Sequence, residues 1–305
     1  MRIVCIGECM LELRAEDEER YRRSFAGDVY NTAVYLKRSL PMAQVQFFTC
    51  TGDDAISRAM RGAWRREGID GSLAVSIPHE FPGLYMIETD TRGERSFLYW
   101  RGQSAARRWL SRLRERADEV LRGADLVYFS GISLAILTTE ERAAGIELLS
   151  HWRRHVGRIV FDPNVRPSLW SAPQAARETI EAVATIADVV LPSAEDAQWL
   201  YGTAVPLEQL TAFGRLNVAE VALTLGAAGC LVLEQQVVTR VEAPVAAKVT
   251  DTSGAGDAFN GAYLAARLRG GTPIEAARAG LLVASRVVAH PGAIVPVEIS
   301  HPNGL

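Results

Sequence analysis

The sequence predicts an α/β protein with a mostly parallel central sheet and helices on both faces of that sheet. Short apolar or β-branched runs alternate along the chain with longer stretches of helical periodicity, the pattern of a doubly covered parallel sheet. The 305 residues, of which 48% are hydrophobic and 23% charged, suffice for one large folded unit with an appendage. Because no linker, repeat or low-complexity tract interrupts the chain, we expect a single domain over residues 1–305.

The alternation defines the elements in order. The predicted strands are 3–7, 45–50, 126–130, 158–162, 189–191 and 219–225, each a short apolar run. The predicted helices are 31–40, 54–66, 138–155, 175–187, 195–201 and 258–268, each with apolar residues at helical spacing. Strands joined in sequence through helices lie parallel, so this order favours a parallel sheet.

Two regions, 11–25 and 83–101, break this order. The second contains two candidate strands, 84–89 and 94–100, joined by a turn at residues 90–93 with the sequence Asp-Thr-Arg-Gly. We expect both regions to pair into a small β lid at one edge of the main sheet, and lids of this kind close over small-molecule sites. The unpaired strand edges of such a lid predict a homo-oligomer formed through it.

Charge and composition exclude several classes of protein. The formal net charge of −3 leaves no basic footprint for nucleic acid or an anionic membrane, and the basic run 101–116 is followed by acidic residues, as on an exposed helix face. No stretch reaches the roughly 18 apolar residues that span a bilayer, and the first apolar run is too short for a signal peptide. We therefore expect a cytoplasmic protein without membrane or nucleic-acid partners.

No protein-held metal site is predicted. Cys5 and Cys9 lack a second close pair of ligands, and all four cysteines are expected to be reduced core thiols. His151 and His155 have helical spacing, but the glutamate of a zinc-binding helix is missing and two arginines lie between them, so a solvated helix end is expected.

The strongest motif is Gly-Ala-Gly-Asp at 254–257, just before a predicted helix. Successive backbone amides from Gly254, Ala255 and Gly256 at a helix N-terminus form a nest in which a phosphoryl group can bind. Asp257, in the first helical turn, is either a partner of the helix dipole or a base that takes a proton from a hydroxyl beside the bound phosphoryl group. The Gly-x-Gly before it favours the second interpretation.

Two further segments carry polar residues. Asp-Pro-Asn-Val-Arg at 162–166 follows a predicted strand and so lies at the carboxyl edge of the sheet, where open α/β folds bind ligands. It is either a proline-bounded turn or a ligand loop in which Arg166 binds a carboxylate or phosphate. Gly27 and Asn31 flank the start of a predicted helix. Residues of these types are common at helix starts, so their presence there requires no functional role.

These segments resemble the ribokinase-like carbohydrate kinases, the PfkB family, over essentially the whole chain. The resemblance rests on residues 254–257, the glycine-to-asparagine segment ending at Asn31, residues 162–166, and Thr-Leu-Gly-Ala-Ala-Gly at 224–229. Segments 7–13, 83–90 and 93–101 are similar to the family members that act on 2-keto-3-deoxy-D-gluconate, and the last two lie in the expected lid.

The resemblance implies ATP-dependent phosphorylation of the terminal hydroxyl of this sugar acid, giving the 6-phosphate. Asp257 would be the general base, and the amides of 254–256 would be the anion hole. The residues implied to bind the sugar acid are Gly27, Asn31, Tyr85, Tyr99, Trp100, Arg101, Arg166 and Asp257. Those implied on the nucleotide side are Asn164, Arg166, Ser193, Thr224, Gly226, Gly229, Gly254, Ala255 and Gly256. Mg²⁺ would arrive with ATP, and Asp251 is a candidate contributor to a monovalent-cation site.

The residue chemistry supports a sugar acid independently. A carboxylate needs a cation, and Arg101 and Arg166 lie on segments that feed the site. Tyr85 and Tyr99 either pack on the carbon chain of the substrate or are ordinary strand tyrosines. The alternatives are a kinase for a neutral sugar such as fructose, or a non-catalytic sensor of sugar acids.

Two departures from the family pattern stand out. Ala26 occupies a position where many members have glycine, which adds a methyl group near the sugar. Ser193 and Asp196 occupy the positions of an Asn-x-x-Glu motif that helps to place hydrated magnesium.

Overall fold

The main sheet has eight strands, and it confirms the predicted fold class. A computed structural model describes residues 1–17, 19–89 and 95–297. In spatial order the strands are β14 (Val237–Val241), β13 (Cys230–Glu234), β12 (Glu220–Thr224), β11 (Val189–Val190), β10 (Ile159–Asp162), β9 (Leu126–Ser130), β1 (Arg2–Ile6) and β4 (Gln44–Phe48). The six strands from β12 to β4 are parallel, and β13 and β14 continue the sheet antiparallel.

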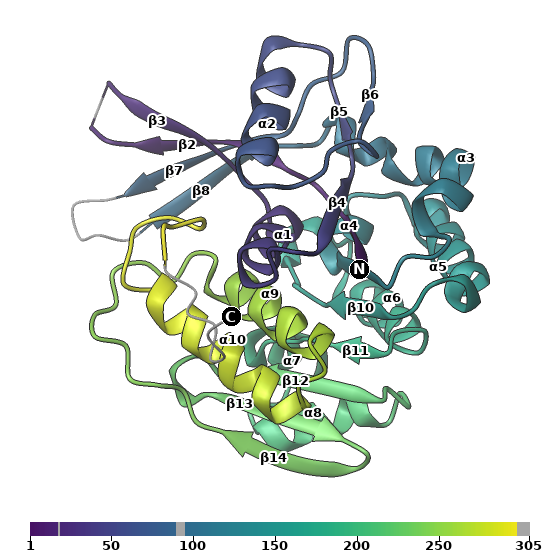
Figure 1. Cartoon of the computed structure of the whole chain (residues 1–305), viewed down its shortest axis with the longest axis vertical. Helices are drawn as coiled ribbons and strands as arrows, with labels where there is room; N and C mark the ends of the chain where they lie inside the picture. The colour runs from purple at the N-terminus through teal and green to yellow at the C-terminus, as the bar shows by residue number, and fades with distance from the viewer. Residues whose placement is uncertain (18, 90–94, 298–305) are drawn as a thin grey trace.

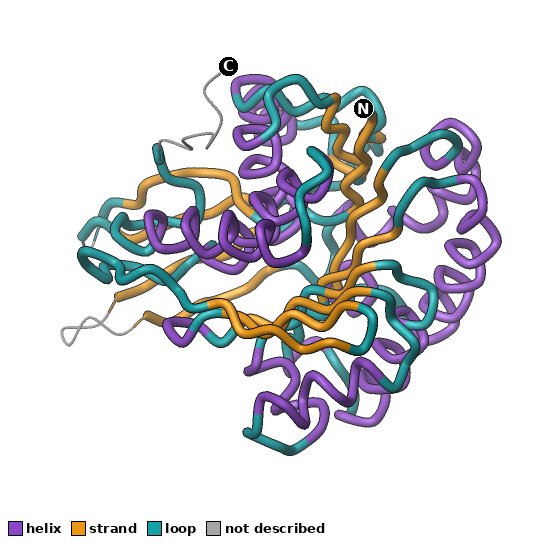
Figure 2. Tube along the Cα trace, turned by 60° about the horizontal axis from the view of Figure 1, so that its bottom comes forward, coloured by secondary structure: helices purple, strands orange, loops and turns teal. Residues whose placement is uncertain are grey.

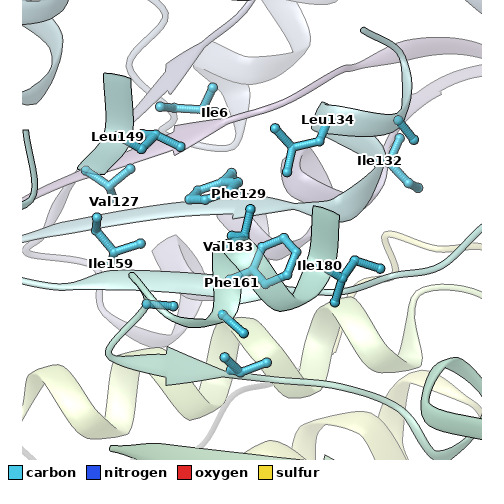
Figure 3. Packing of buried hydrophobic residues seen from close by; sticks show 14 of the residues in the cluster. Ile6, Val127, Phe129, Ile132, Leu134, Leu149, Ile159, Phe161, Ile180 and Val183 are labelled. Carbon is cyan, nitrogen blue, oxygen red and sulfur yellow. The ribbon is translucent and has the colours of Figure 1, made fainter. Parts of the chain in front are cut away.

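Helices cover both faces of this sheet (Figure 2). One face packs against α1 (Asp28–Ser39), α2 (Ala55–Arg66), α9 (Ala255–Leu268) and α10 (Pro273–Val287). The other packs against α3 (Trp109–Leu121), α4 (Gly131–Ala135), α5 (Thr139–Trp152), α6 (Pro173–Ala184), α7 (Ala194–Tyr201) and α8 (Pro206–Gly214). Alternate residues of β1 enter the two cores, since Ile3 faces the first and Val4 the second. Figure 3 shows the second core around Phe129 and Phe161.

Helices α1 and α9 approach each other closely at Gly261. A Cβ on Gly261 would lie 2.6 Å from the amide nitrogen of Leu36 and 2.8 Å from the carbonyl oxygen of Thr32, both on α1. Only glycine permits this backbone contact. The contact brings the first turns of the two helices, and the residues that they carry, side by side.

A second sheet of four strands projects from the main body (Figure 1). Its order is β3 (Tyr21–Ala26), β2 (Met10–Ala15), β7 (Leu84–Thr89) and β8 (Arg95–Trp100), with β2 and β7 parallel and the other pairs antiparallel. The strands come from the two regions that break the sequence alternation. We call these four strands the lid sheet. The predicted turn at 90–93 lies outside the described residues.

Several boundaries differ from the sequence prediction. The predicted strand 45–50 divides, because only its first part stays in the main sheet while β5 (Cys50–Thr51) pairs with β6 (Val75–Ser76) in a separate ribbon. Helix α9 begins at Ala255, three residues earlier than predicted, so that Asp257 lies in its first turn as expected. Within the described residues, no helix is both long and apolar enough to cross a membrane.

Candidate active site

The Gly-Ala-Gly-Asp segment forms the turn that starts α9. Gly254 precedes the helix in a left-handed conformation, with φ of 72°, and no side chain caps the helix start. A Cβ on Gly254 would lie 2.4 Å from the carbonyl oxygen of Ala293, so the turn packs directly on a neighbouring backbone segment. The amide of Ala255 donates to the Thr252 carbonyl over 3.3 Å, and Gly256 is exposed. The open helix start suits an anion.

Asp257 faces the start of α1. Its Oδ2 accepts a hydrogen bond of 2.8 Å from the side-chain amide of Asn31, and the amide of Gly27 donates to Oδ1 of Asn31 over 3.3 Å. Desolvation, together with the neighbouring carboxylate of Asp28, raises the pKa of Asp257 to about 7. A carboxyl group with such a pKa exchanges a proton readily near neutral pH, which a general base requires.

Gly27 makes the link between α1 and the segment that follows β1. A Cβ at this position would lie 2.3 Å from the carbonyl oxygen of Glu8, so no other residue fits without a shift of backbone. Gly27 has extended backbone, with φ of 169°, and its role is therefore close approach and not conformational freedom.

A cluster of carboxylates surrounds Asn164, which has a left-handed φ of 33°. The side-chain amide of Asn164 donates to Asp28 over 2.9 Å, and its backbone amide donates to Asp162 over 3.0 Å. Asn260 of α9 donates to the other oxygen of Asp162 over 2.9 Å. Desolvation and the neighbouring carboxylates raise the pKa of the buried Asp162 well above its usual value. The Asp162 contacts tie the loop after β10 to α9.

The loop after β10 is also tied to α7. The backbone amide of Val165 donates to Asp196 over 2.6 Å, while Ser193 and Asp196 form a capping box at the start of α7. Arg166, next in the chain, is exposed, and its guanidinium donates to the Val165 carbonyl over 3.0 Å. Arg166 forms no close ion pair in the described part of the chain, although its positive charge acts to lower the pKa values of Asp162, Asp196 and Asp257.

The predicted nucleotide residues Thr224, Gly226 and Gly229 lie where β12 ends. Thr224 bridges to Ser193, and its amide donates to the Pro192 carbonyl over 2.9 Å. Gly226 and Gly229 have positive φ, of 58° and 95°, and enclose a short 3-10 turn that is exposed at its tip. The three residues therefore lie at the carboxyl edge of the sheet.

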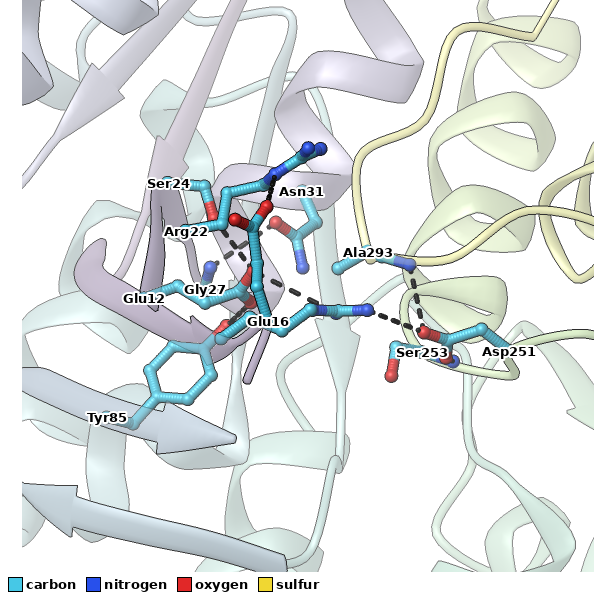
Figure 4. Close-up of polar contacts among 12 residues, drawn as sticks. Glu12, Glu16, Arg22, Ser24, Gly27, Asn31, Tyr85, Asp251, Ser253 and Ala293 are labelled. Carbon is cyan, nitrogen blue, oxygen red and sulfur yellow. Dashed lines mark hydrogen bonds and ion pairs between the residues drawn. The ribbon is translucent and has the colours of Figure 1, made fainter. Parts of the chain in front are cut away.

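The lid residues divide into buried and exposed groups. Tyr85 is buried and donates its hydroxyl to Glu12 (Figure 4). The centre of its ring lies 5.7 Å from that of Tyr99. Tyr99 and Trp100, by contrast, are 49% and 55% exposed. They lie on β8, an edge strand of the lid sheet, so their rings remain accessible to a ligand or to another chain.

Arg101 is buried and paired, contrary to the free loop cation that the sequence suggests. Its guanidinium forms an ion pair with Glu8, whose side chain is only 1% exposed. Arg101 Nε and Glu8 Oε1 have no hydrogen-bond partner within the described chain. No local pattern indicates this pairing, because the two residues are 93 positions apart.

The structure thus links Gly27, Asn31 and Asp257 by hydrogen bonds, and Asn164 lies beside them through its bond to Asp28, the residue after Gly27. Sequence reasoning assigns no ligand-binding role to Asp28 or Asp162, although both stand next to residues of the motifs that it selects.

In the described ranges, no three His, Cys, Asp or Glu side chains are arranged to hold a metal ion. A surface groove elsewhere includes none of the predicted residues; it is lined by Arg23, Ser24, Phe25, Tyr30, Ala63, Arg66, Glu67 and Ile294.

Comparison with known proteins identifies the family. The sequence profile of the pfkB family carbohydrate kinases matches residues 1–300. The chain belongs to the PfkB family. It is 39% identical to the 2-dehydro-3-deoxygluconokinase of Dickeya dadantii, with 97% of each chain covered. It is also 39% identical to the enzyme of the same name from Escherichia coli K12, covering 97% of this chain and 98% of that one.

A solved structure agrees with the fold of this PfkB kinase. Fructokinase from Vibrio cholerae, crystallised with fructose, ADP and a calcium ion, superimposes with a TM-score of 0.82 at 27% identity. The match covers 96% of this chain and 94% of that one. The protein is therefore a carbohydrate kinase with a ribokinase-like fold, and kinases of this family use ATP.

Proposed function

We propose that this kinase transfers the γ-phosphoryl group of ATP to the 6-hydroxyl of 2-keto-3-deoxy-D-gluconate, also called 2-dehydro-3-deoxygluconate. The observation that carries the proposal is the pair formed by Asn31 and Asp257 beside the open start of α9. The names of the relatives at 39% identity support a sugar acid as the acceptor.

In the proposed reaction, Asp257 takes the proton of the 6-hydroxyl. The hydroxyl oxygen then bonds to the γ-phosphorus, and the bond from that phosphorus to the bridging oxygen breaks to release ADP. The amides of Gly254, Ala255 and Gly256 form the anion hole for the transferring group. Their position at the N-terminus of α9 supports this role, because the helix dipole stabilises negative charge there.

The sugar acid is proposed to lie between the main body and the lid sheet. Gly27 and Asn31 approach it from α1, and the lid contributes Tyr85, Tyr99, Trp100 and Arg101. Arg166 is the cation that we assign to the carboxylate, because its charge is not already paired within the described residues. Arg101 is already paired with Glu8, so only the N–H groups of its guanidinium that do not contact Glu8 are proposed to bind the substrate.

The nucleotide is proposed to bind along the carboxyl edge of the main sheet. Asn164, Arg166, Ser193, Thr224, Gly226 and Gly229 are the residues assigned to it, together with the anion hole. Mg²⁺ enters as part of the substrate Mg-ATP, since Ser193 and Asp196 are occupied in capping α7. Asp251 remains our candidate contributor to a monovalent-cation site.

We propose further that the chain acts as one domain whose lid sheet closes over the sugar, and that it forms a homo-oligomer. The edge strand β8 supports the second point, because Phe97, Leu98, Tyr99 and Trp100 are all at least 42% exposed. A cytoplasmic location fits the four cysteines, which are free and buried.

A kinase for a neutral sugar is the second candidate, and the fold shared with a fructose-bound fructokinase supports it. The deciding experiment offers the purified protein Mg-ATP with either 2-keto-3-deoxygluconate or fructose at matched concentrations, and measures ADP release. We expect preference for the acid by orders of magnitude. Preference for fructose would overturn the choice of substrate, and no turnover with either would favour a non-catalytic sensor.

A further inference from the structure

Arg14 connects the lid sheet to the loop that leads into the anion-binding turn. Its Nη1 donates to Oδ2 of Asp251 over 3.2 Å, joining residues 237 positions apart. Asp251 is 4% exposed and Arg14 is 21% exposed. A carboxylate withdrawn from water in this way needs a countercharge, and Arg14 supplies one from β2 of the lid sheet.

Asp251 organises the anion-binding turn. Its Oδ1 accepts from the amide of Ser253 over 2.7 Å, and its Oδ2 accepts from the amide of Gly292 over 2.9 Å. Ser253 directly precedes Gly254, whose missing side chain lets the turn pack against Ala293. One carboxylate therefore holds the turn and the backbone segment on which the turn packs.

The other side of Arg14 faces the sugar-binding half of the lid. Its Nη2 lies 3.9 Å from Oε1 of Glu12 and has no hydrogen-bond partner among the residues described. Glu12 accepts from the hydroxyl of Tyr85 and, over 2.8 Å, from Ser24. Figure 4 shows Glu12 and Tyr85 on one side of this network and Asp251 on the other. The guanidinium thus stands between two carboxylates that belong to two different parts of the molecule.

We propose that Arg14 is a positioning residue that couples sugar binding at the lid sheet to the geometry of the anion-binding turn. Movement of Glu12 and Tyr85 around a bound sugar changes the electrostatic environment of the guanidinium, and the guanidinium in turn fixes Asp251 and the turn that it holds. The inference rests on the proposed function, because it takes the lid as the sugar side and the turn as the phosphoryl side.

The first test measures how sugar changes nucleotide affinity. Titration calorimetry of Mg-ADP, with and without saturating sugar, gives the coupling, which is expected to be on the order of 10-fold in the unaltered enzyme. Arg14→Ala is expected to reduce that coupling to less than about twofold, and Arg14→Lys, which keeps the charge, to retain part of it. The matched control is Arg22→Ala on the adjacent strand β3, which removes a surface pair with Glu16 and leaves the coupling intact.

A second test separates the charge from the packing of the side chain. Guanidinium ion at tens of millimolar, far below the molar range that unfolds proteins, is added to Arg14→Ala and to Arg14→Met. The ion is expected to restore coupling in Arg14→Ala, where the space is free, and not in Arg14→Met, where a side chain of similar length fills it. Urea at the same concentration is the control, and thermal unfolding confirms that each variant is folded.

Undiminished coupling in Arg14→Ala would overturn the proposal, as would an equal response of the Ala and Met variants to guanidinium. If Arg14→Ala does not fold, coupling in Arg14→Met equal to that of the unaltered enzyme would overturn it in the same way. The sugar in these assays is whichever one the unaltered enzyme phosphorylates. Failure of 2-keto-3-deoxygluconate as a substrate would therefore count against the proposed function and not against the role of Arg14.

Discussion

The side-chain amide of Asn31 donates to Oδ2 of Asp257 over 2.8 Å, although the two residues are 226 positions apart in the chain. Each lies in the first turn of its helix, Asn31 in α1 and Asp257 in α9. The hydrogen bond fixes one carboxylate oxygen and leaves the other free to accept a proton. This relationship gives the first of four predictions, and that first prediction has two parts.

Asp257→Asn is expected to lower kcat by about 10²- to 10⁴-fold while the dissociation constants of sugar and nucleotide change by only a few-fold, because a base acts mainly in the transition state. Asparagine keeps the shape and can still accept from Asn31. Single-turnover kinetics and calorimetry would measure the two effects separately. Unchanged kcat would rule out Asp257 as the base.

The same variant is expected to gain stability at alkaline pH. The folded-state pKa of Asp257, about 7, lies above the ordinary carboxyl value, so its ionisation costs stability as pH rises from about 4 through 7. Removing the ionisable group should stabilise the fold by on the order of 1–3 kcal/mol at pH 8, and by less at pH 5. Thermal unfolding of both proteins at the two pH values measures the difference. A gain in the stability of Asp257→Asn that does not grow with pH would contradict a pKa of about 7 for Asp257.

The second prediction concerns the pH dependence of the reaction. A base with a pKa of about 7 makes kcat/KM rise with pH through that value and then level off. The carboxylate of Asp28 contributes to the raised pKa, so Asp28→Asn should shift the rising limb to lower pH. The substitution retains an oxygen that can accept from Asn164. If the rising limb of the profile stays at the same pH in Asp28→Asn, the group that titrates is not Asp257.

The third prediction concerns Gly254. Alanine there adds backbone strain, since φ is 72°, and also places Cβ 2.4 Å from the Ala293 carbonyl oxygen. Gly270 is the matched control, because its φ of 89° is equally left-handed but a Cβ at that position would have nothing within 4 Å. We expect Gly270→Ala to cost about 1–2 kcal/mol without loss of activity, and Gly254→Ala to cost more and to impair phosphoryl transfer. Equal losses of stability and activity in the two variants would contradict the close packing of the turn.

The fourth prediction separates the two arginines. Arg166→Ala is expected to raise KM for the sugar acid at least 10-fold with a smaller loss of stability than Arg101→Ala, because Arg166 is exposed and forms no close ion pair in the described chain. Arg101→Ala strands the buried carboxylate of Glu8 and should destabilise the fold by about 3–5 kcal/mol. Kinetics and unfolding of both variants test this contrast. A neutral substrate, if one is accepted, should lose less kcat/KM in Arg166→Ala than the acid does, because only the acid also loses the partner of its carboxylate.

The main sheet could be predicted because strand and helix patterns alternate clearly. The prediction for β9 was correct to the residue, and α2 and α7 were within one residue of their observed starts. The hairpin of β13 and β14 was not predicted. Its turn consists of Gln235 and Gln236, both with positive φ, where the usual Asn-Gly or Asp-Gly signal is missing. Tertiary packing overrides the local preference there.

The candidate site was predictable where one segment holds the chemistry, as at 254–257. Contacts between distant segments were not, because neither spacing nor residue type encodes them. Arg101 was expected to be a free cation, and its pairing with Glu8 could not be predicted. Arg14 lies on the lid sheet and in none of the motifs, so its pairing with Asp251 could not be predicted either.

The backbone contact at Gly261 fixes how close two helices of the main body come to each other. It holds α1 close to α9, so the spacing of Asn31 and Asp257 is set by a contact in which the lid sheet takes no part. An exchange of the lid strands should therefore keep the spacing of Asn31 and Asp257, whereas the partner that Asp251 has in Arg14 must be retained in the new lid.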